Sequence, residues 1–406
     1  MTFDAYYNRF LRLALRLARR GQGVTSPNPM VGAVLVKAGK VIGQGWHHGP
    51  GLPHAEIEAL RDARQRQHDP RGATLYVTLE PCSTHGRTPP CTDAIVEAGI
   101  RRVVVGAIDP NPRHAGRGLT QLRRGGIEVL GPAPGDGRAP RRGVAIAISR
   151  DCERLNEAFN HWIVEKMPFV TVKAAMTLDG KIATSGGESK WITGVEARRE
   201  GMLLRRAADA ILVGVNTILA DDPRLTYRSW RSEVGGQRSE VGGRKKALRR
   251  IILDAMARTP LGANVVRDEF ADLTTIVVSR RAPRRRVTAL ARKVRVLVAP
   301  RQTRNSKLKT QNWFIDLRWL LRRLGLEEVT HLLVEGGGEV NGSFLLGGLA
   351  QRVVFFYAPK ILGGRDARRG VAGVGAARLE EVLSLRDLQW KKRGPDLMLT
   401  ARVVSV

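Results

Sequence analysis

The residues best suited to chemistry in this chain are a histidine, a glutamate and two cysteines. His54 and Glu56 are separated by one residue, Pro81-Cys82 follows twenty-five residues after Glu56, and Cys91 completes the group. One imidazole and two thiolates suit zinc and leave one tetrahedral position for water. A glutamate that is not a ligand can move protons between that water and a departing amine. The pattern therefore predicts a hydrolytic zinc deaminase, since it matches a known signature of nucleobase deaminases.

The spacing between the two cysteines departs from that signature. Eight residues separate Cys82 from Cys91, where the usual motif has two. The intervening loop contains Gly86 and Pro89-Pro90, which can form a turn and a return path to one metal. The alternative is that both cysteines are small buried side chains or form a disulfide. His54 and Glu56 upstream favour the metal site.

Length and composition bound the class of protein. A chain of 406 residues is too long for one typical core and predicts two domains. Three cysteines are too few for a disulfide scaffold and favour a reducing compartment. The sequence contains no apolar run of about 20 residues, as a membrane span requires. Arginines interrupt the N-terminal apolar stretch, which indicates an amphipathic first helix instead of a signal peptide. We expect a cytoplasmic protein with no membrane association.

The net charge of +30 allows three interpretations. Clustered Lys and Arg could bind nucleic acid, or a positive field could steer a small anionic substrate. The third interpretation is a solvated basic surface without a function. Aromatic residues are only 5% of the chain, which is unlike a platform for single-stranded nucleic acid. We therefore favour the third interpretation and do not expect a nucleic-acid partner.

Alternating strand and helix patterns predict an α/β protein. The first half should form a domain over residues 1–166, with a hairpin turn at Ala38-Gly39 and a linker helix at about 151–166. A second domain should occupy residues 167–406. Residues 231–237 and 238–244 are a tandem duplication rich in glycine and charge, so we expect a mobile insertion at 229–249.

A glycine cluster follows an apolar strand in the second half. The segment Val334–Ser343 runs from strand to glycines to helix, which offers backbone N–H groups and a helix N-terminus to a phosphate. It is not the dinucleotide fingerprint, because the sequence has no G-x-G-x-x-G in an early βαβ unit. Alone, such a turn is weak evidence for binding.

Taken together, these motifs resemble one enzyme family. The segments Glu80–Cys91 and Leu219–Pro223, and the order of motifs from Asn28-Pro29 to Gly394–Asp396, resemble the bifunctional deaminase/reductases of riboflavin biosynthesis over nearly the whole chain. The resemblance implies an N-terminal cytidine-deaminase-like α/β/α domain followed by a C-terminal dihydrofolate-reductase-like α/β domain.

The resemblance also implies two reactions. In the first, zinc hydroxide deaminates 2,5-diamino-6-(5-phosphoribosylamino)pyrimidin-4(3H)-one by hydrolysis. In the second, NADPH reduces the ribosyl group of 5-amino-6-(5-phosphoribosylamino)uracil to ribityl. The implied cofactors are one Zn²⁺ per chain and NADPH, the partner is a small phosphoribosyl pyrimidine, and the chain is expected to form a homo-oligomer.

Site residues follow from the family's motif positions. Glu56 would be catalytic, and His54, Cys82 and Cys91 would hold the metal. The deaminase substrate would contact Asn28, His47, His85, Arg87, Asp109 and Asn111, although the histidines could equally be surface residues. The reductase substrate would contact Ser189, Arg205, Leu225, Arg228 and Glu335, with the arginines suited to its phosphate. The cofactor would contact Ala175, Trp191, Thr217, Asp221, Gly337, Gly338, Glu339, Val340, Asn341, Gly342 and Ser343. Lys173 and Asp179 are either catalytic or structural ion pairs.

Two other functions compete with the two-step enzyme. A zinc deaminase acting on nucleic acid would share the metal motif and suit the positive charge, but it would not need a reductase domain. A non-enzymatic basic binding protein would not need an intact zinc and glutamate motif.

Overall fold

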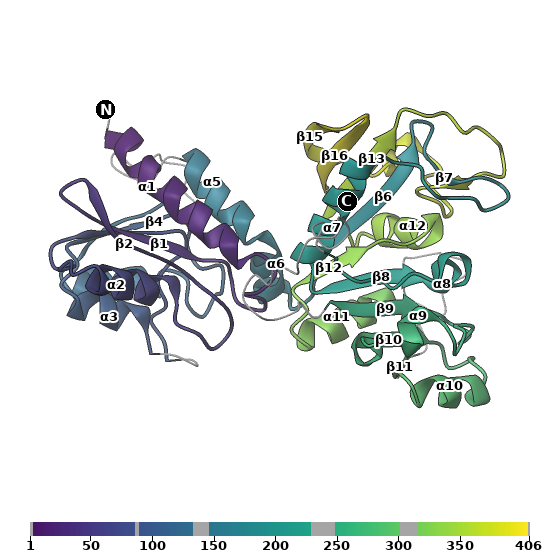
Figure 1. The fold of residues 1–406 in the computed structure, drawn as a ribbon, viewed down its shortest axis with the longest axis horizontal. Coiled ribbons are helices and arrows are strands. Elements are labelled where there is room, and N and C mark those ends of the chain that lie inside the picture. Colours follow the sequence, from purple (N-terminus) through teal and green to yellow (C-terminus); the bar gives the residue numbers. More distant parts are fainter. Residues whose placement is uncertain (1–2, 86–88, 133–145, 229–247, 301–314, 405–406) are drawn as a thin grey trace. The chain divides into compact units, whose positions relative to one another are not determined.

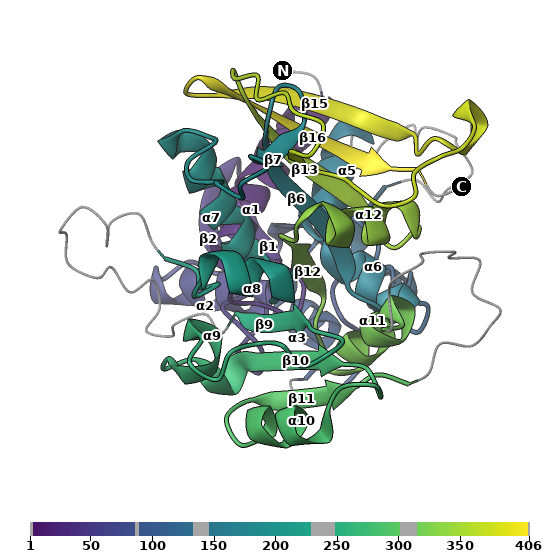
Figure 2. The ribbon, with the colours of Figure 1, turned by 90° about the vertical axis from the view of Figure 1, so that its right-hand side faces the viewer.

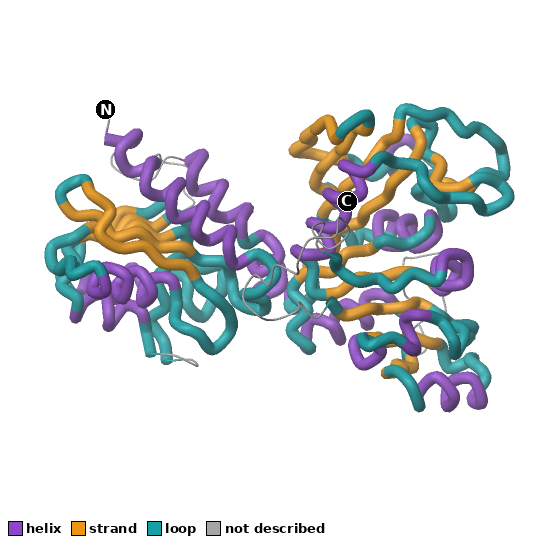
Figure 3. Tube along the Cα trace, in the orientation of Figure 1, coloured by secondary structure: helices purple, strands orange, loops and turns teal. Residues whose placement is uncertain are grey.

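The computed structural model describes residues 3–85, 89–132, 146–228, 248–300 and 315–404 (Figure 1). The chain divides into two compact units, Met1–Lys166 and Met167–Val406. Each unit contains a sheet with helices packed on it (Figure 3). Within the described ranges, no helix combines the length and apolar character needed to cross a membrane.

The first unit is an α/β/α sandwich. Its elements are α1 (Phe3–Ala18), β1 (Gly32–Lys37), β2 (Lys40–Trp46), α2 (Ala55–Gln65), β3 (Thr74–Val77), α3 (Cys91–Glu97), β4 (Arg102–Val105), α4 (Arg117–Arg124), β5 (Glu128–Leu130), α5 (Ile146–Leu155) and α6 (Glu157–Glu165). The strand order is β2-β1-β3-β4-β5. The pairs of β1 with β2 and β3 are antiparallel, and those of β4 with β3 and β5 are parallel.

Alternating side chains of these short strands supply two cores. One face packs on α2, α3 and α4 through residues such as Leu35, Leu75 and Ile95. The other packs on α1 and α5 through residues such as Leu11 and Tyr76. A strand buried on both faces reads as a continuous apolar run, which is why these strands could be recognised from the sequence.

Two local predictions can be compared directly with the structure. The turn between β1 and β2 lies at Ala38-Gly39 as expected, and both residues have positive φ, as a two-residue hairpin turn requires. The linker helix expected at 151–166 is wrong as a single helix. α5 begins earlier, at Ile146, and Asn156 separates it from α6.

The second unit contains a larger, mainly parallel sheet. Its elements are β6 (Phe169–Thr177), β7 (Lys181–Ala183), α7 (Val195–Ala207), β8 (Ala210–Gly214), α8 (Val215–Asp221), β9 (Arg249–Leu253), α9 (Asn264–Arg267), β10 (Thr274–Val278), α10 (Arg284–Ala291), β11 (Arg295–Val298), α11 (Leu317–Leu326), β12 (His331–Val334), α12 (Gly338–Leu346), β13 (Arg352–Ala358), β14 (Arg368–Arg369), β15 (Leu385–Arg393) and β16 (Asp396–Val403).

The strand order of this sheet is β11-β10-β9-β8-β12-β6-β13-β16-β15. Pairing is parallel from β11 to β13, whereas β16 is antiparallel to both β13 and β15. Figure 2 shows β11 near one edge and the β15–β16 hairpin at the other. The predicted insertion at 229–249 lies outside the described residues up to 247; Leu248 is buried and Arg249 begins β9.

A buried ion pair joins β9 of this sheet to the residue that follows α9. Arg250 on β9 has no exposed surface, and its guanidinium donates to both carboxylate oxygens of Asp268 at 2.7 and 2.8 Å. It also donates to Thr274 Oγ1 and to the carbonyl of Val265. A buried guanidinium with this many partners cannot lose its counter-charge cheaply.

We therefore expect Asp268→Ala to lower the free energy of unfolding of the second unit by about 3–5 kcal/mol, because it leaves the Arg250 charge buried and unpaired. Urea denaturation followed by circular dichroism measures the change. Asp272→Ala removes an exposed carboxylate nearby and should change stability by less than about 0.5 kcal/mol. Equal effects of the two substitutions would contradict this assignment.

Candidate functional site

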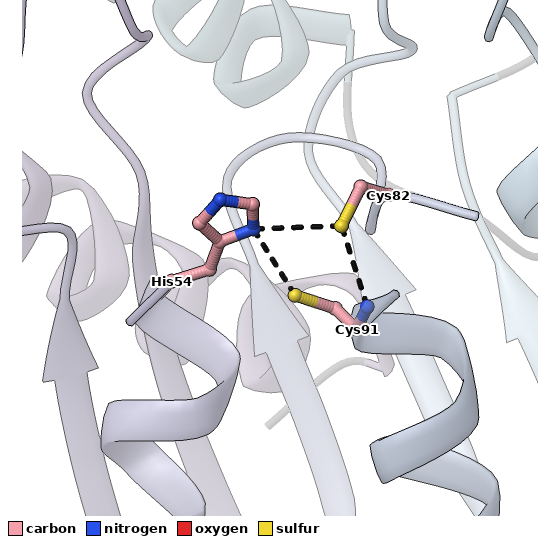
Figure 4. A group of neighbouring side chains, drawn as sticks. All are labelled: His54, Cys82 and Cys91. Atoms are coloured by element: carbon pink, nitrogen blue, oxygen red, sulfur yellow. Dashed lines mark hydrogen bonds between the residues drawn. The ribbon is translucent and has the colours of Figure 1, made fainter. Parts of the chain in front are cut away.

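The His54, Cys82 and Cys91 side chains point toward one another in the first unit (Figure 4). His54 Nδ1 lies 3.2 Å from Cys91 Sγ and 3.4 Å from Cys82 Sγ. The potential ligand atoms all lie within 4.8 Å of one another. The long spacing between the cysteines is therefore compatible with one common site.

The fold supplies these ligands from the ends of three elements. His54 is the residue just before α2, Cys91 is the first residue of α3, and Cys82 lies in the loop after β3. The Cys91 backbone N–H donates to Cys82 Sγ at 3.3 Å. Backbone donors at the start of a helix stabilise a thiolate, so the local structure favours the charged form of Cys82.

The arrangement fits a tetrahedral zinc ion. Zinc–nitrogen and zinc–sulfur bonds of about 2.0 and 2.3 Å place the two ligand atoms roughly 3.6 Å apart in a tetrahedral site. The separations of 3.2 and 3.4 Å are a few tenths of an ångström shorter than that. Zinc would need only a small outward adjustment of the side chains. Three ligands leave the fourth position for a reacting water.

The electrostatics of the group also suit a cation. A hydrogen bond from the Cys91 thiol, assisted by His54, lowers the pKa of Cys82 to about 4. The same contact and burial raise the pKa of Cys91. The hydrogen bond with Cys82 raises the pKa of His54. A divalent cation would release the remaining protons by stabilising both thiolates and the neutral imidazole.

Glu56 lies in the first turn of α2, beside this group. Its side chain is 3% exposed, and among the described residues its Oε2 atom has no hydrogen-bond partner. Burial raises the pKa of Glu56 to about 7, against the opposing influence of His54. A carboxyl group with a pKa near neutrality can both accept and donate a proton, which general acid–base catalysis requires.

Asn28 and His47 form a hydrogen-bonded pair next to His54. Asn28 Nδ2 lies 3.0 Å from His47 Nε2, and His47 Nδ1 lies 3.1 Å from the carbonyl of Pro53. Because a carbonyl only accepts, Nδ1 carries the proton and Nε2 accepts from Asn28. Burial lowers the pKa of His47, which favours this neutral ring. The ring meets His54 edge-on, with centroids 5.3 Å apart.

Two of the other predicted deaminase residues, Asp109 and Asn111, lie on a loop that Glu80 holds by hydrogen bonds. The buried Glu80 carboxylate accepts backbone hydrogen bonds from Asp109, Gly116 and Gly118. Burial raises the pKa of Asp109, whose Oδ1 atom accepts from the backbone of Asn111. In the sequence, Glu80 stands directly before Pro81-Cys82 and nothing in its spacing indicates this supporting role.

Two other predicted contacts are not tested by the structure. His85 is described and exposed. Arg87 lies outside the described residues. The structure therefore brings Asn28 and His47 to the metal group, whereas a role for His85 and Arg87 stays a prediction.

The second unit contains a cavity of about 610 Å³. The predicted residues that line it are Lys173, Ala175, Ser189, Trp191, Arg205, Arg228 and Glu335. Residues that the sequence analysis missed also line it, among them Arg198, Met202 and Tyr227. Arg198, Met202 and Arg205 recur every three or four residues along α7, and this helical spacing was the signal that could have identified them.

A charged cluster lies in this cavity. Arg205 donates to both Glu335 oxygens at 2.9 and 3.0 Å and also to the carbonyl of Thr226. Lys173 lies 3.6 Å from Glu335. Although burial opposes it, Arg205 and Lys173 lower the pKa of Glu335 to about 2. Arg205 is thus paired with Glu335 in this structure, and phosphate binding by Arg205 and Arg228 stays a prediction.

Trp191 and α7 form part of the cavity lining. The Arg198 guanidinium stacks on the exposed Trp191 ring at 4.6 Å. The Gly194 backbone N–H donates to the buried Asp396 carboxylate at 2.7 Å. Lys190 forms an ion pair with Asp221 at 3.4 Å, which connects this predicted cofactor residue to the segment that contains the cavity residues Ser189 and Trp191.

Asp179 has a local structural role. Its carboxylate accepts from Thr177 and from the backbone of Leu362 and Gly363. The Thr177 hydrogen bond and these backbone donors lower the pKa of Asp179 to about 2. These bonds favour the structural alternative for Asp179, whereas Lys173 forms its ion pair inside the cavity.

The predicted cofactor segment Gly337–Ser343 divides into two parts. Residues 340–343 are buried in α12, and a Cβ atom on Gly342 would lie 1.7 Å from the carbonyl oxygen of Ala372. Gly342 is therefore required for close packing. In contrast, Gly337 has nothing within 4 Å of its Cβ position. The start of α12 is the part of the segment that a phosphate could approach. Thr217 on α8 and the buried Leu225 are not among the residues that line the cavity.

Comparisons with known proteins agree with the division of the chain into two units. Residues 5–107 match the family model of the cytidine and deoxycytidylate deaminase zinc-binding region, and residues 168–399 match the RibD C-terminal domain. The chain is 42% identical to the riboflavin biosynthesis protein RibD of Aquifex aeolicus over 390 residues, covering 96% of each protein. It is 37% identical to RibD of Escherichia coli over 400 residues, covering 98% of each.

Solved structures show the same relationship. Acinetobacter baumannii RibD has a TM-score of 0.80 at 30% identity, with 99% of this chain and 100% of that chain covered. A deaminase/reductase from Thermotoga maritima has a TM-score of 0.76 at 33% identity, with the same coverage.

The fold and the site define an enzyme that joins a zinc-binding deaminase domain to a reductase domain related to NADPH-dependent reductases. The chain belongs to the RibD family of bifunctional riboflavin-biosynthesis enzymes. The expected fold class and the two-step function are thereby confirmed. The alternatives of a nucleic-acid deaminase and a non-enzymatic binding protein are not supported.

We expect Cys91→Ser to abolish stoichiometric zinc binding, because a hydroxyl group replaces one of the three ligands. Metal analysis of purified full-length protein measures the ratio of zinc to chain. Cys152→Ser is the matched control, since Cys152 is also buried but lies outside the metal group. Full zinc occupancy of the Cys91 variant would contradict the ligand assignment.

Proposed function

We propose that the first domain deaminates 2,5-diamino-6-(5-phosphoribosylamino)pyrimidin-4(3H)-one and that the second reduces the ribosyl group of the product to ribityl. The observation that carries the proposal is the pairing, in one chain, of a partly buried group of potential metal ligands beside Glu56 with a cavity lined by cations. The Thermotoga maritima relative is named as a deaminase and reductase of such phosphoribosyl pyrimidines.

In the deaminase site, His54, Cys82 and Cys91 would hold zinc. Bound zinc would activate water toward the amino-bearing carbon of the pyrimidine. Glu56 accepts the proton of that water and delivers a proton to the departing ammonia. Its burial keeps its pKa near neutrality, which suits both transfers. Asn28 retains an amide oxygen and one N–H group with which to orient the ring.

In the reductase site, NADPH would supply the hydride. The start of α12, at Gly337 and Gly338, offers backbone N–H groups to a cofactor phosphate. Arg228 suits the substrate phosphate. Lys173 lies 3.6 Å from the Glu335 carboxylate in the cavity and donates a hydrogen bond or proton to the ribosyl ring oxygen as its bond to the reacting carbon breaks and that carbon takes the hydride. Arg205 positions Glu335.

We also propose a cytoplasmic location, a homo-oligomer and a small anionic substrate. The family resemblance supports a cytoplasmic location and a homo-oligomer, and the low cysteine content agrees with a reducing compartment. The excess of lysine and arginine in the reductase cavity supports a small anionic substrate.

Glu56→Gln tests the deaminase step. It keeps the side-chain volume but cannot shuttle protons, so ammonia release should fall by roughly 10²- to 10⁴-fold. NADPH oxidation on supplied deaminated substrate should be unchanged. Glu58→Gln alters a carboxylate on the same helix that pairs with Arg61, and it should leave both activities intact. Loss of both activities in a folded Glu56 variant would contradict the proposed division of labour.

Lys173→Met tests the reductase step. Removing the ammonium group from the cavity should slow NADPH oxidation by roughly 10- to 100-fold, because a donor to the developing oxyanion is lost. A coupled absorbance assay at 340 nm, the wavelength at which NADPH absorbs, measures this rate on the deaminated substrate. Ammonia release should stay at the wild-type rate. Lys293→Met removes an exposed lysine and serves as the control; equal slowing by both variants would exclude a specific role for Lys173.

A further inference from the structure

The break between α5 and α6 places a buried asparagine against a distant loop. Asn156 is 3% exposed. Its Oδ1 atom accepts from the Met30 backbone N–H at 2.8 Å, and its Nδ2 atom donates to the Met30 carbonyl at 2.9 Å. One side chain thus satisfies both main-chain groups of a residue 126 positions away in sequence, as a neighbouring strand would.

Met30 belongs to the segment that holds His47. Two residues before Met30, the Asn28 side chain donates to His47 Nε2 at 3.0 Å. One residue after Met30, the Val31 carbonyl accepts from the His47 backbone N–H at 3.0 Å. Met30, which Asn156 binds, therefore lies between Asn28 and Val31, the two residues of this segment that form hydrogen bonds with His47.

His47 in turn lies directly beside the metal group. Its Nδ1–H donates to the carbonyl of Pro53, the residue before His54, at 3.1 Å. The two histidine rings meet edge-on at 5.3 Å. A shift of Met30 would therefore be passed to Asn28 and His47, and a displacement of about 1 Å at a catalytic site can cost as much as 10²-fold in rate.

We propose that Asn156 is a positioning residue for deamination: through Met30 it fixes Asn28 and His47 relative to the metal ligands. The inference rests on the proposed deaminase function. Asparagine is well matched to this task because it supplies one donor and one acceptor in a single planar group. Alanine supplies neither, and aspartate supplies only acceptors.

The test is a double-mutant cycle in zinc-loaded, full-length protein. Asn156→Ala should lower kcat/KM for ammonia release by about 10- to 100-fold, while NADPH oxidation on supplied deaminated substrate stays within about twofold of wild type. If Asn156 acts through Asn28 and His47, the loss in the double variant Asn156→Ala, Asn28→Ala should fall well short of the product of the two single losses. A purely structural role would give independent losses that multiply.

Asn160→Ala is the matched control. Asn160 lies on α6, one helical turn after Asn156, but in the part of the chain that the structure describes its side chain donates to the carbonyl of Glu153 on α5 and not to Met30. It should leave ammonia release at the wild-type level.

Three results would overturn the inference. They are wild-type deamination by zinc-loaded Asn156→Ala, multiplicative losses in the double variant, or equal losses in Asn156→Ala and Asn160→Ala. If Asn156→Ala does not retain zinc, Asn156→Asp replaces it, because aspartate still accepts from the Met30 N–H; wild-type deamination by that variant would also overturn the inference. Failure of wild-type protein to release ammonia would instead overturn the proposed function and, with it, this inference.

Discussion

Burying an ionised side chain costs several kcal/mol unless opposite charges or hydrogen bonds compensate for the lost hydration. The two sites differ in what supplies this compensation. In the reductase domain, Glu335 is compensated by Arg205 and Lys173 within the cavity itself. In the deaminase domain, two thiols and an imidazole lie close together where a cation would compensate their charge. The charges of the reductase site are thus compensated by the protein itself, whereas those of the deaminase site need the metal ion.

Glu80 and Glu56 show two opposite outcomes of carboxylate burial within one domain. Glu80 accepts several backbone N–H bonds and so fixes the loops that follow β3 and β4. Glu56 lacks a comparable set of partners, and burial leaves its pKa near neutrality. The same residue type therefore supplies rigidity at one position and, at the other, a carboxyl group whose pKa suits the proposed proton transfer.

The metal group could be predicted from the sequence because its chemistry needs only residue types and approximate spacing. The parallel strands were also predictable, since strands buried on both faces are continuous apolar runs. The pairing of Arg205 with Glu335 was not, because residues 130 positions apart meet only in the folded sheet. The break at Asn156 was missed for the same reason, because the residue that its side chain contacts, Met30, is 126 positions away in sequence. The C-terminal hairpin was also missed, because its exposed strand β15 lacks an apolar run.

The position of that hairpin has a consequence for the order in which the two domains can be completed during synthesis. All strands of the deaminase sheet are encoded before residue 167, so this domain has its full set of elements early. In contrast, β16 pairs with β13, and Asp396 at its start accepts a hydrogen bond from Gly194, which follows cavity residue Thr193. The second domain therefore cannot complete its sheet until β16, at Asp396–Val403, has been synthesised. A nascent chain can therefore acquire the means for the first reaction well before it can perform the second.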